Sequence, residues 1–166
     1  MDFSGSVKDA GATYVVFGKA STTAVNLATL GTGGFAVVSN MVNKDIGANY
    51  ADSAYTYSGY TVTALGDVNG DGLADLGLTA PLADAAGIRY DAGKAYIVYG
   101  SKATTTINLS DVEKGVGGFA IQGTAQSHLG LSIANAGDFN GDGFADIVVS
   151  AVSYTHLRAH ETSLHL

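Results

Sequence analysis

The feature that most constrains the fold is a stretch of ten residues that occurs twice. GDVNGDGLAD at residues 66–75 returns as GDFNGDGFAD at residues 137–146, which is 71 positions later. The residues on both sides of the two copies also correspond, so the similarity extends beyond the stretch itself. Self-similarity at a fixed distance is the signature of repeat architectures, in which each unit buries its apolar faces against its neighbours. We therefore expect tandem copies of one structural unit.

A second pair of similar segments defines the limits of this unit. DAGATYVVFGKA at residues 9–20 matches DAGKAYIVYGSKA at 91–103, and VNLATLGTGGFAV at 25–37 matches INLSDVEKGVGGFAI at 107–121, with two extra residues in the later copy. We therefore predict a partial unit at residues 1–57, with a long insertion at 38–57. A complete unit follows at 58–122, and a further unit starts at 123–151. Because the chain begins and ends within a unit, we expect a protein truncated at both ends.

Short apolar runs predict that the units are built from strands. Runs rich in Val, Ile, Thr, Tyr and Phe are bounded by Gly, Asn, Asp or Ser, and none shows a sustained helical period. In the complete unit they lie near residues 60–65, 76–80, 94–99 and 118–122. The 23 glycines and single proline of the chain fit short strands joined by tight turns. A four-stranded sheet repeated in tandem is typical of propeller blades. The predicted fold is therefore all-β, with four-stranded antiparallel β-propeller blades.

The repeated acidic stretch is also the candidate metal site. Oxygen-bearing side chains occupy positions 1, 3, 5 and 9 of each copy, and the glycine at position 6 allows a turn that directs the carbonyl of position 7 toward an ion. Hard oxygen donors favour Ca²⁺ over Zn²⁺ or copper, while Mg²⁺ prefers to keep waters in a tighter octahedron. The predicted ligands of two Ca²⁺ sites are Asp67, Asn69, Asp71, Leu73 (carbonyl) and Asp75, and Asp138, Asn140, Asp142, Phe144 (carbonyl) and Asp146.

An EF-hand and a plain hairpin turn are the two alternatives to a calcium loop in this stretch. An EF-hand requires a bidentate Glu at position 12 and flanking helices, whereas position 12 is Leu78 or Val149 and both flanks have strand patterns. A plain hairpin turn would explain the Asn-Gly and Asp-Gly pairs. It would not explain three carboxylates within nine residues in both copies. Without a cation these carboxylates would repel one another, so we favour the calcium loop.

These residues resemble the FG-GAP repeats of integrin α-subunit-like propellers, particularly the bacterial versions. The resemblance rests on the acidic loop and the Tyr-Val-Val-Phe-Gly strand, and it covers most of residues 9–151. The sequence has Ser58-Gly59 and Leu129-Gly130 where the family has Phe-Gly, and it departs from Gly-Ala-Pro at residues 79–81 and 150–152. These departures concern blade packing rather than cation ligands. The resemblance implies a seven-bladed propeller with Ca²⁺ in the hairpin loops of certain blades, and a role in extracellular adhesion and recognition.

Composition argues against several classes of function. The net charge of −7, from 15 acidic and 8 basic residues, disfavours binding to nucleic acid or an anionic membrane. No segment reaches the roughly 20 apolar residues of a membrane helix, so we expect no membrane insertion. The chain has no cysteine and therefore no disulfide or thiolate metal site. The sequence contains no Ser/His/Asp set, phosphate-binding loop or nicotinamide fingerprint. We therefore predict that the chain is not an enzyme and has no catalytic or cofactor-binding residues. His128 is expected to be a surface or turn residue.

The final residues do not continue the repeat. The similarity ends after Ala151, and residues 152–166 hold three of the four histidines of the chain. His156 and His160, with Glu161, have the i, i+4 spacing of a helical metal or acid–base cluster. However, VSYTHLRAHET is similar to one reading frame of a transposase-type sequencing adapter. We therefore interpret residues 152–166 as adapter-derived and place no site there.

These observations together predict a calcium-binding propeller module of a secreted or cell-surface protein, in which Ca²⁺ is structural. Its role would be adhesion or recognition, its partner would be a protein or a carbohydrate, and its sheets would pack against neighbouring blades. The alternative is a non-catalytic accessory propeller within a larger extracellular enzyme, such as a hydrolase or a lyase.

Overall fold

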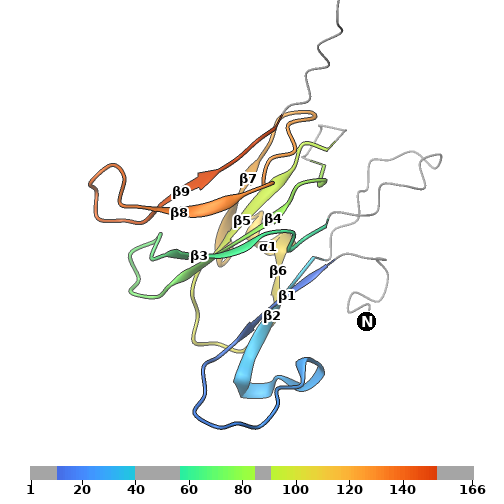
Figure 1. Ribbon diagram of the computed structural model, residues 1–166, viewed down its shortest axis with the longest axis vertical. Helices are drawn as coiled ribbons and strands as arrows, with labels where there is room; N and C mark the ends of the chain where they lie inside the picture. The colour runs from blue at the N-terminus through green and yellow to red at the C-terminus, as the bar shows by residue number, and fades with distance from the viewer. Residues whose placement is uncertain (1–10, 40–56, 85–90, 153–166) are drawn as a thin grey trace, which may run out of the picture.

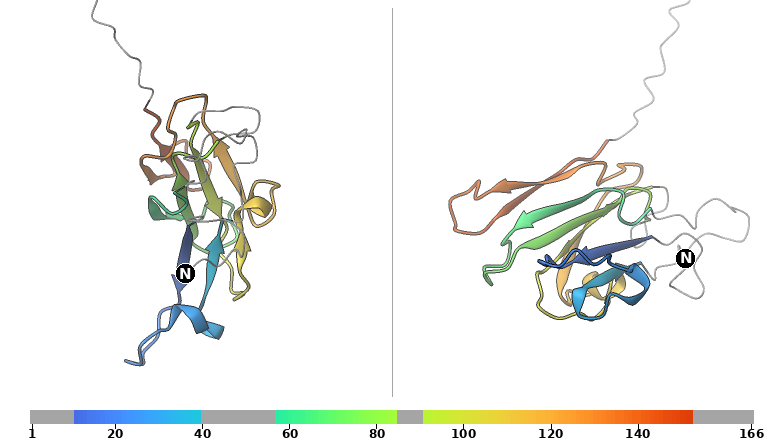
Figure 2. Two further views of the ribbon diagram at one scale, coloured as in Figure 1. Left: turned by 90° about the vertical axis from the view of Figure 1, so that its right-hand side faces the viewer. Right: turned by 60° about the horizontal axis from the view of Figure 1, so that its bottom comes forward.

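The computed structural model describes residues 11–39, 57–84 and 91–152, and it places their strands in three stacked sheets (Figure 1, Figure 2). The middle sheet contains β3 (Val62–Gly66), β4 (Asp75–Ala80), β5 (Lys94–Val98) and β7 (Gly118–Gln122), in that order. All of its pairings are antiparallel. These strands coincide with the predicted runs of the complete unit, so the all-β fold with a four-stranded antiparallel blade is confirmed.

The two outer sheets contain fewer strands. The first sheet pairs β1 (Ala12–Val16) with β2 (Gly34–Val38), and the third pairs β8 (Ile133–Gly137) with β9 (Asp146–Val149); both pairings are antiparallel. Residues 40–56, which make up most of the predicted insertion, lie outside the described part of the chain. The histidines and the glutamate of the predicted adapter-derived segment also lie outside it.

The connection between β5 and β7 contains elements that the sequence patterns did not predict. β6 (Ile107–Asn108) pairs in parallel with β2 of the first sheet, and the short helix α1 (Leu109–Val112) follows it directly. At the corresponding position before β2 lie two 3-10 turns, η1 (Leu27–Thr29) and η2 (Gly31–Gly33). Helices are therefore limited to single turns in the described residues. A two-residue strand leaves no periodicity in a sequence, and its parallel pairing depends on a segment about 70 positions away.

Two apolar cores separate the three sheets. Because successive side chains of a strand point to opposite faces, β5 supplies Tyr96 and Val98 to one core, and Ala95 and Ile97 to the other. The first core joins these side chains to Phe35 and other residues of the first sheet, and the second core joins them to residues of the third. All residues of β5 are buried. The middle sheet is therefore covered on both faces.

Candidate calcium loops

Each acidic loop begins at a bulge in the strand that precedes it. The register of β3 with β4 shifts between Ala64 and Gly66, and that of β8 with β9 shifts between Asn135 and Gly137. Gly66 and Gly137 have φ values of 78° and 69°, which lie in the left-handed region where glycine is favoured. The bulge pairs each glycine with the aspartate at position 9 of its loop. The two ends of each loop are thereby held together.

The aspartate at position 1 organises the backbone of each loop. In the first loop, Oδ1 of Asp67 accepts hydrogen bonds from the N–H groups of Gly70 and Asp71 at 2.7 and 3.0 Å. Its Oδ2 accepts from the N–H of Gly72 at 2.8 Å. Asp138 makes the same bonds with residues 141, 142 and 143 of the second loop, at 2.8, 2.9 and 3.0 Å. The backbone therefore wraps around the first carboxylate in both copies.

Positions 3 and 5 also point into the loop. The amide group of Asn69 accepts from the N–H of Asp71 at 3.0 Å and donates to its Oδ2 at 2.9 Å, and Oδ1 of Asp71 accepts from the N–H of Leu73 at 2.8 Å. Asn140 and Asp142 repeat this arrangement, with all distances equal to 2.9 Å. The hydrogen bond from the backbone N–H of residue 144 lowers the pKa of Asp142, and the Asn140 side chain adds to this effect. These hydrogen bonds direct the side-chain oxygens of positions 3 and 5 toward the backbone of the loop.

The aspartates at position 9 differ between the two loops. Asp75 is only 2% exposed, and its two oxygens accept from the N–H groups of Val68 at 2.8 Å and Gly100 at 2.7 Å. Gly100 follows β5, so the third strand of the blade helps to close the first loop. Asp146 is partly buried and accepts at Oδ2 from the N–H groups of residues 139 and 140 at 2.7 and 3.2 Å. The described part of the third sheet contains no strand corresponding to β5.

The donor set of each loop fits Ca²⁺ in its chemistry. Each loop offers carboxylate, amide and backbone oxygens, which are the ligands that Ca²⁺ prefers. An ionised carboxylate has about four lone-pair sites, so an oxygen that accepts one N–H can still contact a cation. Within the described residues, however, no three His, Cys, Asp or Glu side chains are gathered into a group that could hold a metal. The third carboxylate of the first loop, that of Asp75, is directed to two backbone N–H groups instead. The assembly of the full ligand set therefore stays a prediction.

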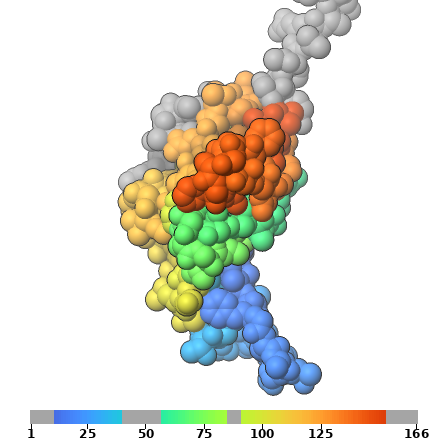
Figure 3. Space-filling view, turned by 90° about the vertical axis from the view of Figure 1, so that its left-hand side faces the viewer, coloured from blue at the N-terminus to red at the C-terminus, as the bar shows by residue number. Residues whose placement is uncertain are grey.

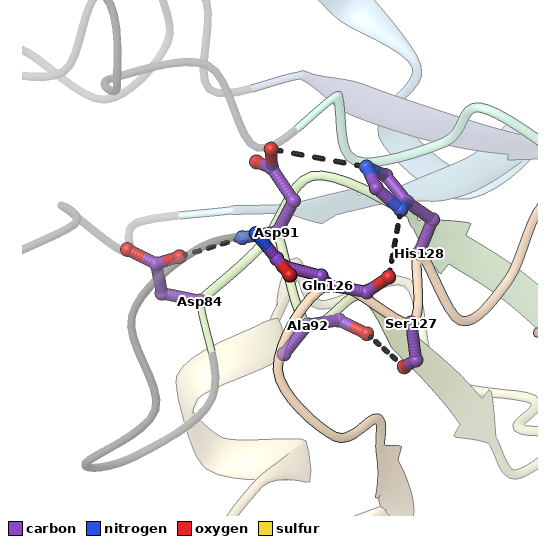
Figure 4. A network of polar contacts seen from close by, with 6 residues as sticks. All are labelled: Asp84, Asp91, Ala92, Gln126, Ser127 and His128. Carbon is purple, nitrogen blue, oxygen red and sulfur yellow. Dashed lines mark hydrogen bonds and ion pairs between the residues drawn. The ribbon is translucent and has the colours of Figure 1, made fainter. Parts of the chain in front are cut away.

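His128, in the connection between β7 and β8, belongs to a polar network with Asp91, which precedes β5 (Figure 4). Its Nδ1 is 3.2 Å from the carbonyl oxygen of Gln126, and its Nε2 is 3.8 Å from a carboxylate oxygen of Asp91. Ser127 donates from its hydroxyl to the carbonyl of Ala92 at 2.8 Å. Asp91, Gln126 and His128 have φ values of 45°, 60° and 45°, which are unusual for residues with side chains. His128 thus follows the turn at residues 125–126 and helps to hold this connection.

A second polar cluster anchors α1 to the middle sheet and was not found from the sequence. Nζ of Lys94, on β5, lies 2.6 Å from Oε1 of Glu113, which follows α1, and the hydroxyl of Tyr96 donates to the same oxygen at 3.1 Å. Burial, followed by the nearby Glu113 charge, raises the pKa of Tyr96 well above its usual value. Glu113 is one of the two extra residues in the second copy of this segment, and Lys94 stands where the first copy has Ala12. The insertion and its lysine partner together were a signal that could have identified the cluster.

An apolar groove lies between the first and middle sheets, beside the first acidic loop. It has a volume of about 270 Å³ and is lined by residues that include Phe17, Phe35, Leu73 and Tyr99. Asp75 is its one charged lining residue, and both of its oxygens already accept hydrogen bonds. No convergent set of polar groups marks this groove as a catalytic site.

The stacked sheets and their bulged acidic hairpins define the class of the molecule: it consists of propeller blades in tandem. Residues 58–98 and 129–155 match the model of the FG-GAP repeat, and this chain therefore contains FG-GAP repeats and resembles integrin α subunits. The second match includes residues 152–155, which lie beyond Ala151. Each of the two matched segments contains one acidic loop.

Three curated relatives support this assignment. The chain is 35% identical to integrin alpha-PS5 of Drosophila melanogaster over 117 residues, which are 70% of this chain and 11% of that protein. It is 36% identical to integrin alpha-PS2 of the same species over 103 residues, which cover 57% of this chain and 7% of the relative. Identity to integrin alpha-6 of Gallus gallus is 38% over 94 residues, or 56% and 8% of the two chains. The chain thus spans a small part of each relative.

No helix within the described residues is long and apolar enough to cross a membrane.

Proposed function

We propose that this chain is a calcium-stabilised part of an extracellular adhesion or recognition propeller. The observation that carries the proposal is the matching hydrogen-bond pattern of the two acidic loops, in which the same atoms of positions 1, 3 and 5 hold the same backbone N–H groups. Two independent segments fold alike although the tips of both loops are exposed. A common ligand explains this better than a common turn, because each loop holds three carboxylates within nine residues.

The role we propose for Ca²⁺ is structural. Asp67, Asn69, Asp71, the carbonyl of Leu73 and Asp75 would hold one ion, and the corresponding residues 138–146 would hold the other. When bound, the ion would supply positive charge that offsets the repulsion between carboxylates and fixes the hairpin between two strands of a blade. We propose no catalytic step. The partner would be a protein or a carbohydrate rather than a nucleic acid. We also propose a bacterial source, from the resemblance to the bacterial repeats, whereas the relatives found are animal proteins.

Calorimetric titration of the chain with CaCl₂ tests this function. We expect two sites with dissociation constants on the order of 10⁻⁴ to 10⁻³ M, as in extracellular modules, and much weaker binding of Mg²⁺. For a dissociation constant of about 10⁻⁴ M, about 10 mM Ca²⁺ should stabilise the fold by about 2.7 kcal/mol per site. Asp71→Ala and Asp142→Ala should each remove one site.

Asp111→Ala provides the control for these variants, because Asp111 is an exposed acid outside both loops. It should leave both sites and the calcium-induced stabilisation unchanged. Absence of calcium heat with the unmodified chain, or equal losses in the control and the loop variants, would overturn the proposal.

A further inference from the structure

The two acidic loops lie against each other on one face of the molecule (Figure 3). The backbone N–H of Ala145, in the second loop, donates to the backbone carbonyl of Asp67, in the first, at 3.0 Å. The ring of Phe144 covers Gly70: a Cβ atom at Gly70 would lie only 2.6 Å from Cε1 of Phe144. The loops therefore share a hydrogen bond and a packed contact, although they belong to different blades.

These contacts involve the parts of the loops that matter most for an ion. Asp67 is position 1 of the first loop, and its carboxylate holds the N–H groups of Gly70, Asp71 and Gly72. Ala145 lies between position 7 of the second loop, whose carbonyl is a proposed ligand, and position 9, which closes that loop. An ion in the second loop would fix the backbone on both sides of Ala145. The N–H of Ala145 would then hold the residue that organises the first loop.

We propose that the two loops bind Ca²⁺ with positive cooperativity, and that Phe144 and Ala145 are the positioning residues that couple them. This inference rests on the proposed function, because it concerns the same two sites. The physical reason is that ordering a loop costs conformational entropy, and a loop already ordered through its neighbour loses less when its own ion binds. The coupling must be reciprocal, so each ion raises the affinity for the other by the same factor.

The coupling can be measured by a thermodynamic cycle on the full chain. Calorimetric titration with CaCl₂ gives the overall association constant for two ions in the unmodified chain. Asp142→Ala and Asp71→Ala each leave a single site, and they give the separate constants. The overall constant divided by the product of the two separate constants is the coupling factor. We expect a factor of about five or more, which is the lower end of typical coupling between sites.

Phe144→Leu tests the role of the contact. Leucine occupies the same position in the first loop, as Leu73, so the backbone of the loop tolerates it. The substitution keeps the carbonyl of residue 144 and shortens the side chain that covers Gly70. With these three titrations repeated in this background, the coupling factor should fall toward one. Phe139→Leu makes the same chemical change in the same loop, but Phe139 is 87% exposed, so this control should retain the coupling factor of the unmodified chain.

The outcomes separate this inference from the proposed function. If the chain binds two ions with a coupling factor of one, the cooperativity is refuted while the calcium sites stand. If Phe144→Leu and Phe139→Leu lower the factor equally, the contact at Gly70 is not its source and the assignment of Phe144 is refuted. If the unmodified chain binds no Ca²⁺, the proposed function and this inference both fail.

Discussion

Replacing Glu113 with alanine should destabilise the middle sheet far more than an ordinary surface substitution. Glu113 accepts both from Nζ of Lys94 at 2.6 Å and from the hydroxyl of Tyr96 at 3.1 Å. The side chain of Lys94 is only 9% exposed, and that of Glu113 is 24% exposed. Glu113→Ala therefore leaves a largely buried ammonium group without its counterion and a buried hydroxyl without this acceptor.

The size of the effect follows from these exposures. Removing one partner of a fully buried ion pair costs about 3–5 kcal/mol, because the remaining charge has lost its compensation. Glu113 retains access to water, so the cavity left by its side chain lets Lys94 recover part of its hydration. The loss of an acceptor for Tyr96 adds about 1 kcal/mol or more. We therefore expect the free energy of unfolding to fall by about 2–4 kcal/mol.

Urea denaturation followed by circular dichroism measures this change. With a urea dependence of about 2 kcal/mol per molar, a loss of 3 kcal/mol lowers the midpoint by about 1.5 M. The second ion pair of this segment is the control: Lys114 and Asp111 are 3.0 Å apart and 69% and 47% exposed, so Asp111→Ala should cost no more than about 0.5 kcal/mol. Equal shifts for the two variants would refute the reasoning. Lys94→Met combined with Glu113→Gln should recover much of the loss, because no unpaired charge remains.

Three further predictions concern packing and loop closure. Gly77→Ala places a Cβ atom 3.0 Å from methyl groups in the second core, so it should cost about 1–3 kcal/mol in urea denaturation. Leu109→Ala should lower the free energy of unfolding by about 2–5 kcal/mol, because that side chain is fully buried. Leu27 occupies the corresponding position in the first copy and is 47% exposed, so Leu27→Ala should cost about 1 kcal/mol or less. Equal losses would contradict the packing of α1. Asp75→Asn directs an amide NH₂ toward a backbone donor and should lower the free energy of unfolding by about 1–3 kcal/mol. Asp146→Asn should cost less, because Asp146 is less buried. The reverse order in thermal unfolding would contradict the closure of the first loop by Gly100.

The strands and the acidic loops were predictable from sequence because each depends on local patterns. Period-two runs bounded by glycine predicted the middle sheet, and the repeated stretch predicted that two loops would fold alike. A surface or turn position was expected for His128, and the residue follows the turn at residues 125–126. The left-handed backbone of His128, Gln126 and Asp91 was not expected, because no sequence pattern indicates a positive φ at a residue that has a Cβ atom.

The features that the sequence patterns missed depend on contacts between distant segments. β6 forms because it meets the edge of β2, and α1 is held by a lysine on β5 that precedes it by about 15 residues. The contact between the acidic loops depends on how the second and third sheets stack, since Ala145 and Asp67 are far apart in the chain. The sequence identified each loop separately, but only the stacking shows that the two are neighbours.

The comparison of β1 with β5 shows why a repeat needs its neighbours. The two strands align residue for residue, with Tyr14 opposite Tyr96 and Val16 opposite Val98. All of β5 is buried, whereas β1 ends at Val16, which is 44% exposed. Their local sequences are alike, so the difference arises from sheets on both sides of β5. Stability in such an array is the sum of unit and interface terms. The acidic loops lie where two units meet, so an ion bound there would strengthen an interface as well as a hairpin.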